Sequence, residues 1–218
     1  MSIITIFTDG SSLIKDNFYE SSSAIIVYRN YQEIYRGGTY HPDGTNSKGE
    51  VYAMKMAYDK LYELFTIDEI KDSKISIISD SDYVVSSVTK WIYNWAKNGW
   101  LNSNGEKIKF KSTFKYLYEK YLDRSIKNKK IKVFHIKSHI SNIPKARRKF
   151  QVRNDVDITN EEFDFLVRGN VEVDELANEI RINKTEDYES LDRVTEVDST
   201  WGSLQRRDGR IVIKTRLR

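Results

Sequence analysis

Two apolar, strand-forming runs in this chain each end in an aspartate, and this pattern constrains the fold more than any other feature. The run "IITIFT" (3–8) leads into Asp9, and the run "KISIIS" (74–79) leads into Asp80. A carboxylate beside a buried strand costs free energy unless it is paired, hydrogen-bonded or bound to a cation. Because α/β sheets place their sites at the carboxyl ends of strands, we expect the two aspartates to meet at one sheet edge.

The hydrophobic periodicity of the chain predicts a mixed α/β fold. Short or alternating apolar runs indicate strands, and apolar residues at helical spacing, such as Met54, Tyr58 and Leu61, indicate helices. Strands come first and then alternate with helices, which favours a mixed sheet with helices on its faces. The expected strands are 3–8, 24–28, 33–40, 74–80 and 130–139, and the expected helices are 46–65, 81–100, one from 113, and 171–180.

The composition excludes several classes of protein. With 218 residues, 39% of them hydrophobic, the chain can form one domain with additions around a sizeable core. It has no cysteine, which excludes disulfides and thiolate metal sites and favours a reducing, cytoplasmic location. The start, "MSIITIF", lacks the features of a signal peptide. No stretch approaches the roughly 18 to 20 apolar residues of a membrane span, and no protein partner is evident.

The net charge of +4 conceals a strong separation of charge along the chain. Residues 90–153 hold 18 Lys and Arg against 3 Asp and Glu, or +15, and the other positions hold 18 against 29, or −11. A basic block inside an acidic frame suggests a surface for a polyanion. A solvated charged face explains the same counts, so charge alone leaves nucleic acid and this alternative about equally open.

Two further acids join Asp9 and Asp80 as candidate metal ligands, namely Glu50 in the expected 46–65 helix and Asp174 in the last expected helix. Four converging carboxylates would repel one another unless cations lay among them, and oxygen ligands without a His or Cys cluster suit Mg²⁺ or Mn²⁺. Two such ions, about 3.5 to 4 Å apart, would stabilise the attacking and leaving oxygens of a phosphodiester displacement. Each acid taken alone also has a structural explanation, as a turn, first-turn, capping or helix-surface residue.

Five segments in order give the chain a resemblance to the type 1 ribonucleases H, over roughly residues 1–180. The segments are "FTDGS", "TNSKGEVYAM", "SDSDYVVSSVTKW", "HIKSH" and "GNVEVDELAN". The resemblance implies a ribonuclease H-like fold, in which a mixed sheet of five strands, three antiparallel and then two parallel, is flanked by helices. It also implies that Asp9, Glu50, Asp80 and Asp174 are catalytic metal ligands and that His139 assists catalysis.

The function implied by the resemblance is that of a metal-dependent endonuclease that cuts the RNA strand of an RNA–DNA hybrid. Two Mg²⁺ ions, or two Mn²⁺ ions, would be held by the four carboxylates. Asp9 would bridge both ions, Asp174 would complete one of them, and Glu50 with Asp80 would complete the other. The products would carry a 5′-phosphate and a 3′-hydroxyl.

The resemblance also implies contacts with nucleic acid in two regions. Thr45 and Asn46 match positions that touch the backbone, and "KWIYNWAKNGW" resembles the start of a basic protrusion that grips the DNA strand, here residues 91–112. Trp91 and Trp95 are spaced i and i+4, which favours packing of their indoles within a helix. The residues expected to contact nucleic acid in the protrusion are Lys97, Asn98, Trp100, Lys107, Lys109 and Lys111.

An insertion separates the last two motifs. Residues 140–169 are expected to form a mobile basic loop followed by one short docked helix, which starts at Thr159 with a capping box and ends at Gly169. We expect the basic loop to grip substrate near the scissile phosphate, and a plain surface excursion is the alternative. Asp82 is a further departure, because relatives often carry glutamine there.

The catalytic domain is expected to span residues 1–182, and residues 183–218 form a C-terminal extension. Within it, Asp208-Gly209 suggests a hairpin. Two other functions stay open: another nuclease of the same superfamily that acts on DNA, and a non-catalytic hybrid-binding module. The tryptophan-bearing protrusion and "IKSH" argue against the first, and the four acids argue against the second.

Overall fold

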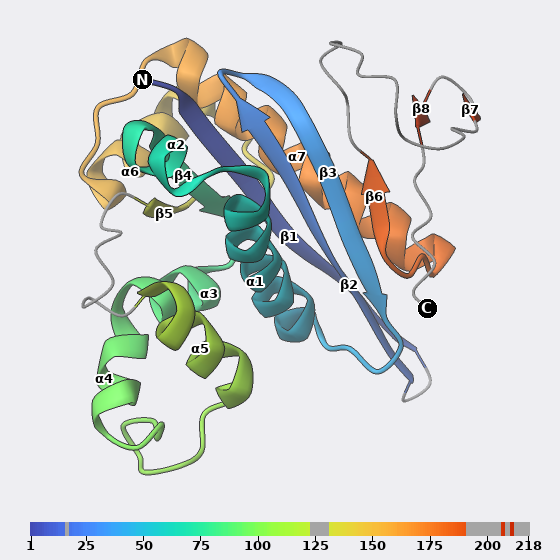
Figure 1. The fold of residues 1–218 in the computed structure, drawn as a ribbon, viewed down its shortest axis with the longest axis vertical. Helices are drawn as coiled ribbons and strands as arrows, with labels where there is room; N and C mark the ends of the chain where they lie inside the picture. Colours follow the sequence, from blue (N-terminus) through green and yellow to red (C-terminus); the bar gives the residue numbers. More distant parts are fainter. Residues whose placement is uncertain (16–17, 123–130, 191–205, 208–209, 212–218) are drawn as a thin grey trace.

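A mixed sheet forms the centre of the computed structural model, which describes residues 1–15, 18–122, 131–190, 206–207 and 210–211. The sheet consists of β1 (Ile3–Lys15), β2 (Phe18–Arg29), β3 (Gln32–His41), β4 (Lys74–Ser79), β5 (Ile131–His135) and β6 (Tyr188–Ser190). Across the sheet the order is β5-β4-β1-β2-β3-β6 (Figure 1). The strands β1, β2, β3 and β6 pair antiparallel, and β4 and β5 continue the sheet in parallel from β1. The predicted mixed α/β fold is confirmed.

The sheet differs from the expected one in strand number and strand length. A sixth strand, β6, pairs antiparallel with β3, where the sequence predicts five strands. The first strand does not end before Asp9 but continues to Lys15, and β2 pairs with it throughout. This extra part is rich in serine, so apolar alternation does not reveal it. Helices cover the neighbouring part of β2, where Ser22 and Ser23 are fully buried, whereas Leu13 and Ile14 at the far end of β1 are exposed.

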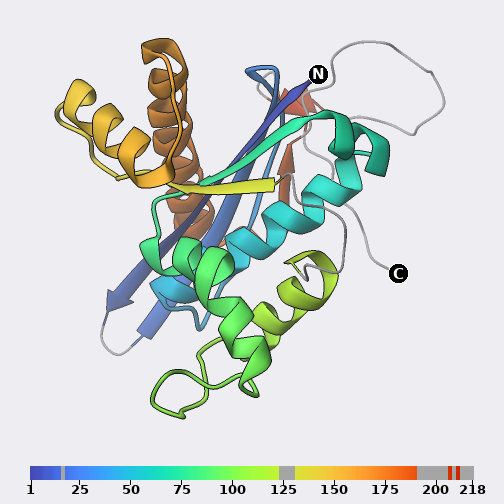
Figure 2. The same ribbon diagram turned by 90° about the vertical axis from the view of Figure 1, so that its left-hand side faces the viewer.

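Helices cover both faces of the sheet. The helix α1 (Asn46–Leu64) lies on one face and α7 (Asn160–Asn183) on the other, as Figures 1 and 2 show from two directions. The remaining helical segments are α2 (Ile67–Asp72), α3 (Asp82–Ser86), the π-helical η1 (Ser87–Trp91), α4 (Ile92–Lys97), α5 (Lys111–Leu117), the π-helical η2 (Tyr118–Leu122) and α6 (Ile143–Asn154). The segment from α4 to α5, which contains the predicted protrusion, projects away from the sheet (Figure 1).

Two apolar clusters lie on opposite faces of the sheet. Ile4 and Ile6 of β1 belong to the cluster under α1, whereas Phe7 belongs to the cluster under α7. Side chains alternate between the two faces along a strand. Asp9 therefore lies on the α7 face, as Phe7 does, and Gly10 lies on the α1 face.

The basic first half of the predicted insertion is a helix and not the expected loop. Asn142 caps α6 with its side chain, and Pro144 stands at the start of the helix, where a missing N–H costs nothing. Ala146 and Phe150, four residues apart, pack against the cluster under α7. This short apolar face docks α6. Lys145, Arg148, Lys149 and Arg153 are exposed, whereas Arg147 is half-buried and donates a hydrogen bond to the carbonyl of Ile158 at 2.8 Å.

The second half of the insertion begins as predicted but does not end as predicted. Thr159 and Glu162 form the expected capping box at the start of α7. Gly169 does not end the helix, because it lies in the middle of α7 against the sheet. A Cβ atom at Gly169 would lie 2.2 Å from the ring of Phe7. The glycine allows close packing, so α7 runs unbroken through Asp174.

The predicted C-terminal extension, residues 183–218, is described only in part. It contains β6 and the two short strands β7 (Arg206–Arg207) and β8 (Arg210–Ile211), which pair antiparallel. This pairing agrees with the predicted hairpin, whose turn residues lie outside the described residues. No helix within the described part of the chain is long and apolar enough to cross a membrane.

Candidate active site

The candidate site lies where the parallel strand β4 ends beside the longer strand β1. The two strands pair as far as Thr8 and Ser79. Asp9 follows Thr8 within β1, and Asp80 follows Ser79, so the end of β4 brings the two aspartates side by side. Asp9 is only 6% exposed, and its Oδ1 accepts a hydrogen bond from the backbone N–H of Gly10 at 2.7 Å.

Glu50 reaches this site because two glycines let α1 approach the sheet closely. A Cβ atom at Gly10 would lie 2.3 Å from the backbone nitrogen of Glu50. A Cβ atom at Gly49 would lie 2.4 Å from the carbonyl oxygen of Ser22. Ser23 Oγ also donates a hydrogen bond to the carbonyl of Gly49 at 2.8 Å. The start of α1 therefore rests directly on β1 and β2, which fixes Glu50 near Asp80.

The carboxylate of Glu50 is held from two sides. Asn46 Nδ2 donates to its Oε1 at 2.8 Å, and Ser81 Oγ donates to its Oε2 at 2.6 Å. Ser81 directly follows Asp80 and also caps α3. Sequence reasoning assigned no role to Ser81, although its place in "SDSD" at the end of a strand was a usable signal. It joins the start of α3 to the start of α1.

Asp174 is brought to the site by α7. Asn178, one turn later, donates from Nδ2 to Asp174 Oδ1 at 3.3 Å and to the Asp174 carbonyl at 3.0 Å. Ser11 Oγ in turn donates to Asn178 Oδ1 at 2.7 Å. Ser11 lies two residues after Asp9 and on the same face of β1. These contacts hold α7 against β1 with Asp174 on the side of Asp9.

The four acids interact electrostatically. Burial is the main cause that raises the pKa of Asp9 to about 9. The charges of Asp80, Asp174 and Glu50 raise this pKa further, and the hydrogen bond from the following backbone N–H lowers it. Burial also raises the pKa of Asp80, and a hydrogen bond with Asp9 opposes this shift. In the protein alone, burial and the neighbouring acids thus oppose the ionisation of Asp9.

By donor type and charge, this group of acids suits a hard divalent cation. A cation would relieve the repulsion among the carboxylates. Among the residues that the structure describes, no three His, Asp or Glu side chains form a group ready to hold one metal ion. Glu50 is instead bonded to Asn46 and Ser81, and Asp80 to Asp9. The donor chemistry fits a cation, whereas a preformed cage is absent from the described residues.

The two histidines of "HIKSH" lie in different surroundings. His139, which the sequence predicts to assist catalysis, is exposed and has a φ angle of 50°. His135 is half-buried at the end of β5 and hydrogen-bonds the backbone of Asp80. Burial, followed by the charge of Arg153, lowers the pKa of His135. Sequence reasoning missed His135, because only the pairing of Ser79 with His135 across β4 and β5 places it at the site.

The predicted backbone contacts at the start of α1 lie next to the acids. Thr45 and Asn46 are both exposed. Thr45 caps α1 through a hydrogen bond from the backbone N–H of Lys48, and Asn46 binds Glu50. Asn46 is therefore part of the acid site as well as a candidate contact for nucleic acid.

Asp82 has a partner that the sequence did not reveal. Arg153 of α6 donates a hydrogen bond to its carboxylate and forms an ion pair with it. This hydrogen bond is the main cause that lowers the pKa of Asp82. Asp82, the residue that departs from the family pattern, is thus neutralised by Arg153 from the insertion.

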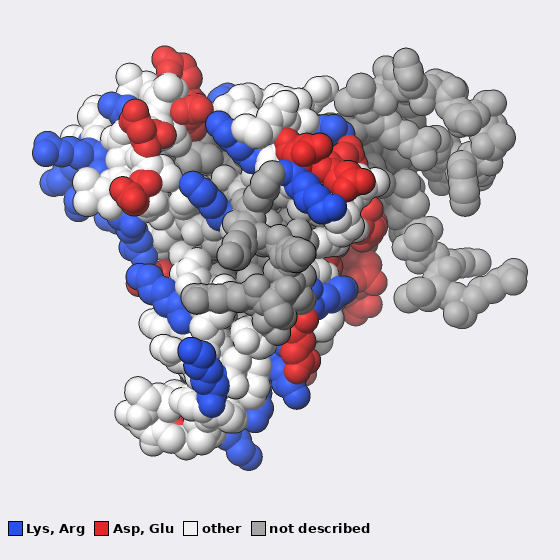
Figure 3. All heavy atoms as spheres, turned by 60° about the vertical axis from the view of Figure 1, so that its left-hand side comes forward, with Lys and Arg blue, Asp and Glu red and all other residues white. Residues whose placement is uncertain are grey.

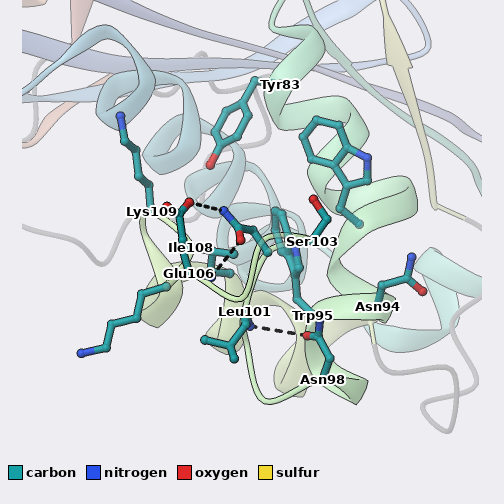
Figure 4. Close-up of a pocket in the computed structure, with 12 residues that line it drawn as sticks. Tyr83, Asn94, Trp95, Asn98, Leu101, Ser103, Glu106, Ile108 and Lys109 are labelled. Atoms are coloured by element: carbon teal, nitrogen blue, oxygen red, sulfur yellow. Dashed lines mark hydrogen bonds between the residues drawn. The ribbon is translucent and has the colours of Figure 1, made fainter.

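The protrusion carries a groove of about 710 Å³, which Tyr83 of α3 lines on the side of the four acids. Figure 4 shows Tyr83 and Trp95 on one side of this groove and Glu106, Ile108 and Lys109 on the other. The side chain of Asn102 closes the loop at its end, since its amide donates to Glu106 Oε2 at 2.9 Å. Of the predicted contact residues, Asn98, Lys107 and Lys109 line the groove.

The remaining protrusion residues lie around this groove. Lys97 and Lys111 are exposed. Trp100 is half-buried and packs edge-on against Tyr118, with the ring centroids 5.8 Å apart. Trp95 is buried, as the packing interpretation predicts. Trp91 packs its ring against that of Trp95, with the centroids 6.0 Å apart, in agreement with the same interpretation, and 41% of the residue stays exposed.

Comparison with known proteins places the chain in a family. The model of the family described as RNase H matches residues 1–181. The chain is 32% identical over 136 residues to the ribonuclease H of Haemophilus influenzae (strain 86-028NP), covering 62% of this chain and 78% of that protein. The fold is similar to the solution structure of the PFV RNase H domain, with a TM-score of 0.58 and 20% identity over 83% of this chain and 94% of that one. It is also similar to part of the foamy viral protease-reverse transcriptase in complex with RNA/DNA hybrid, with a TM-score of 0.54 and 20% identity over 81% of this chain and 19% of that one.

The chain therefore belongs to the RNase H family, as its five motifs predict. It is an enzyme of the ribonuclease H class.

Proposed function

We propose that this protein is an endonuclease that hydrolyses the RNA strand of RNA–DNA hybrids with two divalent metal ions. The observation that supports the proposal is the electrostatic interaction of four acids near the end of β4, where burial and the charges of Asp80, Asp174 and Glu50 raise the pKa of Asp9 to about 9. A divalent cation removes the cause of this repulsion. Membership of the RNase H family and the relative named ribonuclease H support the substrate class.

The four acids divide between two sites for Mg²⁺ or Mn²⁺. Asp9 would serve both ions. Asp174 would complete one site, and Glu50 with Asp80 the other. When bound, the ions supply positive charge at the attacking and leaving oxygens of the phosphodiester. Attack by water at phosphorus and departure of the 3′ oxygen leave a 5′-phosphate and a 3′-hydroxyl.

Several neighbours of the acids have roles in this proposal. Asn46 and Ser81 orient the carboxylate of Glu50 through their hydrogen bonds. At the start of α1, this carboxylate would contact the 2′-hydroxyl, the group that distinguishes RNA from DNA. His139 stays our candidate for proton transfer or product release, because its imidazole is exposed to solvent. Thr45 and the lysines of the protrusion would contact the backbone.

A cleavage assay tests the proposal. A labelled RNA–DNA hybrid is incubated with the protein in Mg²⁺, in Mn²⁺ and in EDTA, beside duplex RNA and duplex DNA of the same sequence. We expect cleavage of the RNA strand of the hybrid only with metal, and products whose 5′ ends carry a phosphate that a phosphatase removes. Cleavage of duplex DNA would favour another nuclease of the superfamily. Hybrid binding without products in either metal would favour a binding module.

A further inference from the structure

A second concave basic surface lies between β5 and α6, outside the group of four acids. This groove has a volume of about 270 Å³. Its polar wall consists of His135, Lys137, Lys149 and Arg153, and Phe150 and Phe163 are among its apolar residues. None of the described residues that line it carries a carboxylate. The groove is thus a small hollow with cations on its wall and a buried apolar base.

The outer face of α6 extends this positive charge. Lys145, Arg148, Lys149 and Arg153 are exposed and line a second, shallower hollow of about 370 Å³. The helix contains no acidic residue. In the described part of the chain, no carboxylate lies within ion-pair distance of Lys145, Arg148 or Lys149. Figure 3 shows Lys and Arg side chains both at the α6 side of the molecule and along the same edge toward the protrusion.

The groove opens next to the acid site. His135, on its wall, hydrogen-bonds the backbone of Asp80. Arg153, also on its wall, forms an ion pair with Asp82, two residues beyond Asp80. Two residues of the groove thus contact the segment that carries Asp80.

We propose that the groove between β5 and α6, with the outer face of α6, binds the phosphate backbone of the substrate nucleic acid beside the cleavage site. The inference rests on the proposed function and adds a substrate contact that belongs to the insertion of this chain. A phosphate is an anion that accepts hydrogen bonds from Lys and Arg, and the lysines of α6 have no competing carboxylate among the described residues. To bind a phosphate, Arg153 would have to give up its ion pair with Asp82, because the phosphate and the carboxylate compete for the same guanidinium.

Hybrid binding measured against salt concentration tests this proposal. The wild-type protein and the double variant Lys137→Ala, Lys149→Ala are titrated with a fluorescently labelled RNA–DNA hybrid in Ca²⁺, so that affinity is read without turnover. We expect the variant to bind several-fold more weakly at low salt. The slope of log K against log salt should fall by roughly 0.7 to 0.9 for each phosphate that the variant no longer neutralises. In Mg²⁺, KM should rise while kcat at saturating hybrid stays unchanged.

A matched control removes the same charge elsewhere. Lys71 and Lys74 are exposed at the opposite end of β4 from Asp80, and the double variant Lys71→Ala, Lys74→Ala should leave the slope unchanged. Equal slopes for the two double variants would overturn the proposal. So would a loss of kcat with unchanged KM in the groove variant. A wild-type protein that binds hybrid but cuts none would count against the proposed function alone, because the binding comparison needs no cleavage.

Discussion

Asp82 of α3 and Arg153 of α6 form an ion pair that joins the segment after the second aspartate of the site to the helix of the insertion. Their side chains are 64% and 45% exposed, so the pair itself contributes only about 0 to 1 kcal/mol to folding. We infer that the pair matters more for substrate binding, because the Asp82 carboxylate pairs with a guanidinium that lines the proposed phosphate groove. The pair therefore sets how freely Arg153 can meet a phosphate.

The first prediction concerns this pair. Asp82→Asn should tighten hybrid binding at low salt, because it frees Arg153 and removes a negative charge near the RNA. Arg153→Ala should weaken binding, and in that background Asp82→Asn should have a smaller effect. Affinities of the two single variants and the double variant, measured in Ca²⁺, give the coupling between the residues. Weaker binding by Asp82→Asn alone would show that the ion pair helps binding by fixing α6.

The second prediction concerns Asp80. Asp80→Asn keeps the shape of the side chain but removes a charged ligand beside Asp9, so kcat should fall by orders of magnitude. Hybrid binding in Ca²⁺ should survive, because the cationic surfaces are unchanged. Asp68→Asn, on the exposed surface of α2, is the matched control and should keep full activity. Undiminished turnover by Asp80→Asn is incompatible with the two-ion assignment.

The third prediction concerns the cation itself. Because burial and repulsion oppose ionisation of Asp9, Mg²⁺ that binds among the acids should stabilise the folded protein. A ligand at a hundredfold excess over its Kd adds about 2.7 kcal/mol. We expect Mg²⁺ to raise the Tm of the wild type more than Na⁺ does at equal ionic strength. The increase should largely vanish in Asp80→Asn, and an equal increase there would place the cation elsewhere.

The fourth prediction concerns the basic arm of the protrusion. Replacing Lys107, Lys109 and Lys111 with Ala should weaken hybrid binding and flatten its salt dependence, by roughly 0.7 to 0.9 in slope for each phosphate left without its lysine. Turnover at saturating hybrid should change little, since these side chains are exposed and apart from the acids. The Lys71→Ala, Lys74→Ala variant is the control, because it shows how far the loss of positive charge elsewhere on the protein changes hybrid binding. A constant slope with a collapsed kcat would instead make the arm part of the active site.

The fifth prediction concerns Gly10. A Cβ atom there would press on the backbone nitrogen of Glu50, so Gly10→Ala must push α1 away from β1. We expect a loss of about 1 to 3 kcal/mol in the free energy of unfolding, and a loss of activity from displacement of Glu50. Denaturant unfolding measures the first effect. Ser12→Ala on the same strand is the control, and equal losses in both variants would contradict this account.

The parts of the fold that obey apolar periodicity could be predicted from the sequence. The strands around Ile6 and Ile77 and the helix around Met54 lie where the pattern places them. The serine-rich ends of β1 and β2 could not be found in this way, because their burial depends on helices that arrive from distant parts of the chain. The helix α6 was hidden for a related reason, since Ala146 and Phe150 form its short buried face among many basic residues.

The candidate site shows the same division between local and long-range information. The acids follow from local motifs, because each motif carries its own carboxylate. Local motifs do not show which of His135 and His139 lies beside Asp80, because this depends on the register of β4 against β5. Gly169 was a helix stop by local rules, whereas its place against Phe7 makes it a packing residue. The ion pair of Arg153 with Asp82 could not be predicted either, because the two residues lie far apart in the sequence and only the fold brings them together.

The short strand β6 has a consequence for how the protein behaves among other molecules. It covers residues 36–38 of β3, and Glu189 within it accepts hydrogen bonds from the Tyr35 hydroxyl at 3.1 Å and from Lys60 Nζ at 3.0 Å. An uncovered edge strand offers unpaired N–H and C=O groups to any other extended chain. A protein shortened before Tyr188 would present β3 in this way, and it would leave the nearly buried Lys60 with one carboxylate fewer. The strand β6 thus shortens the part of β3 that is open to pairing with another chain.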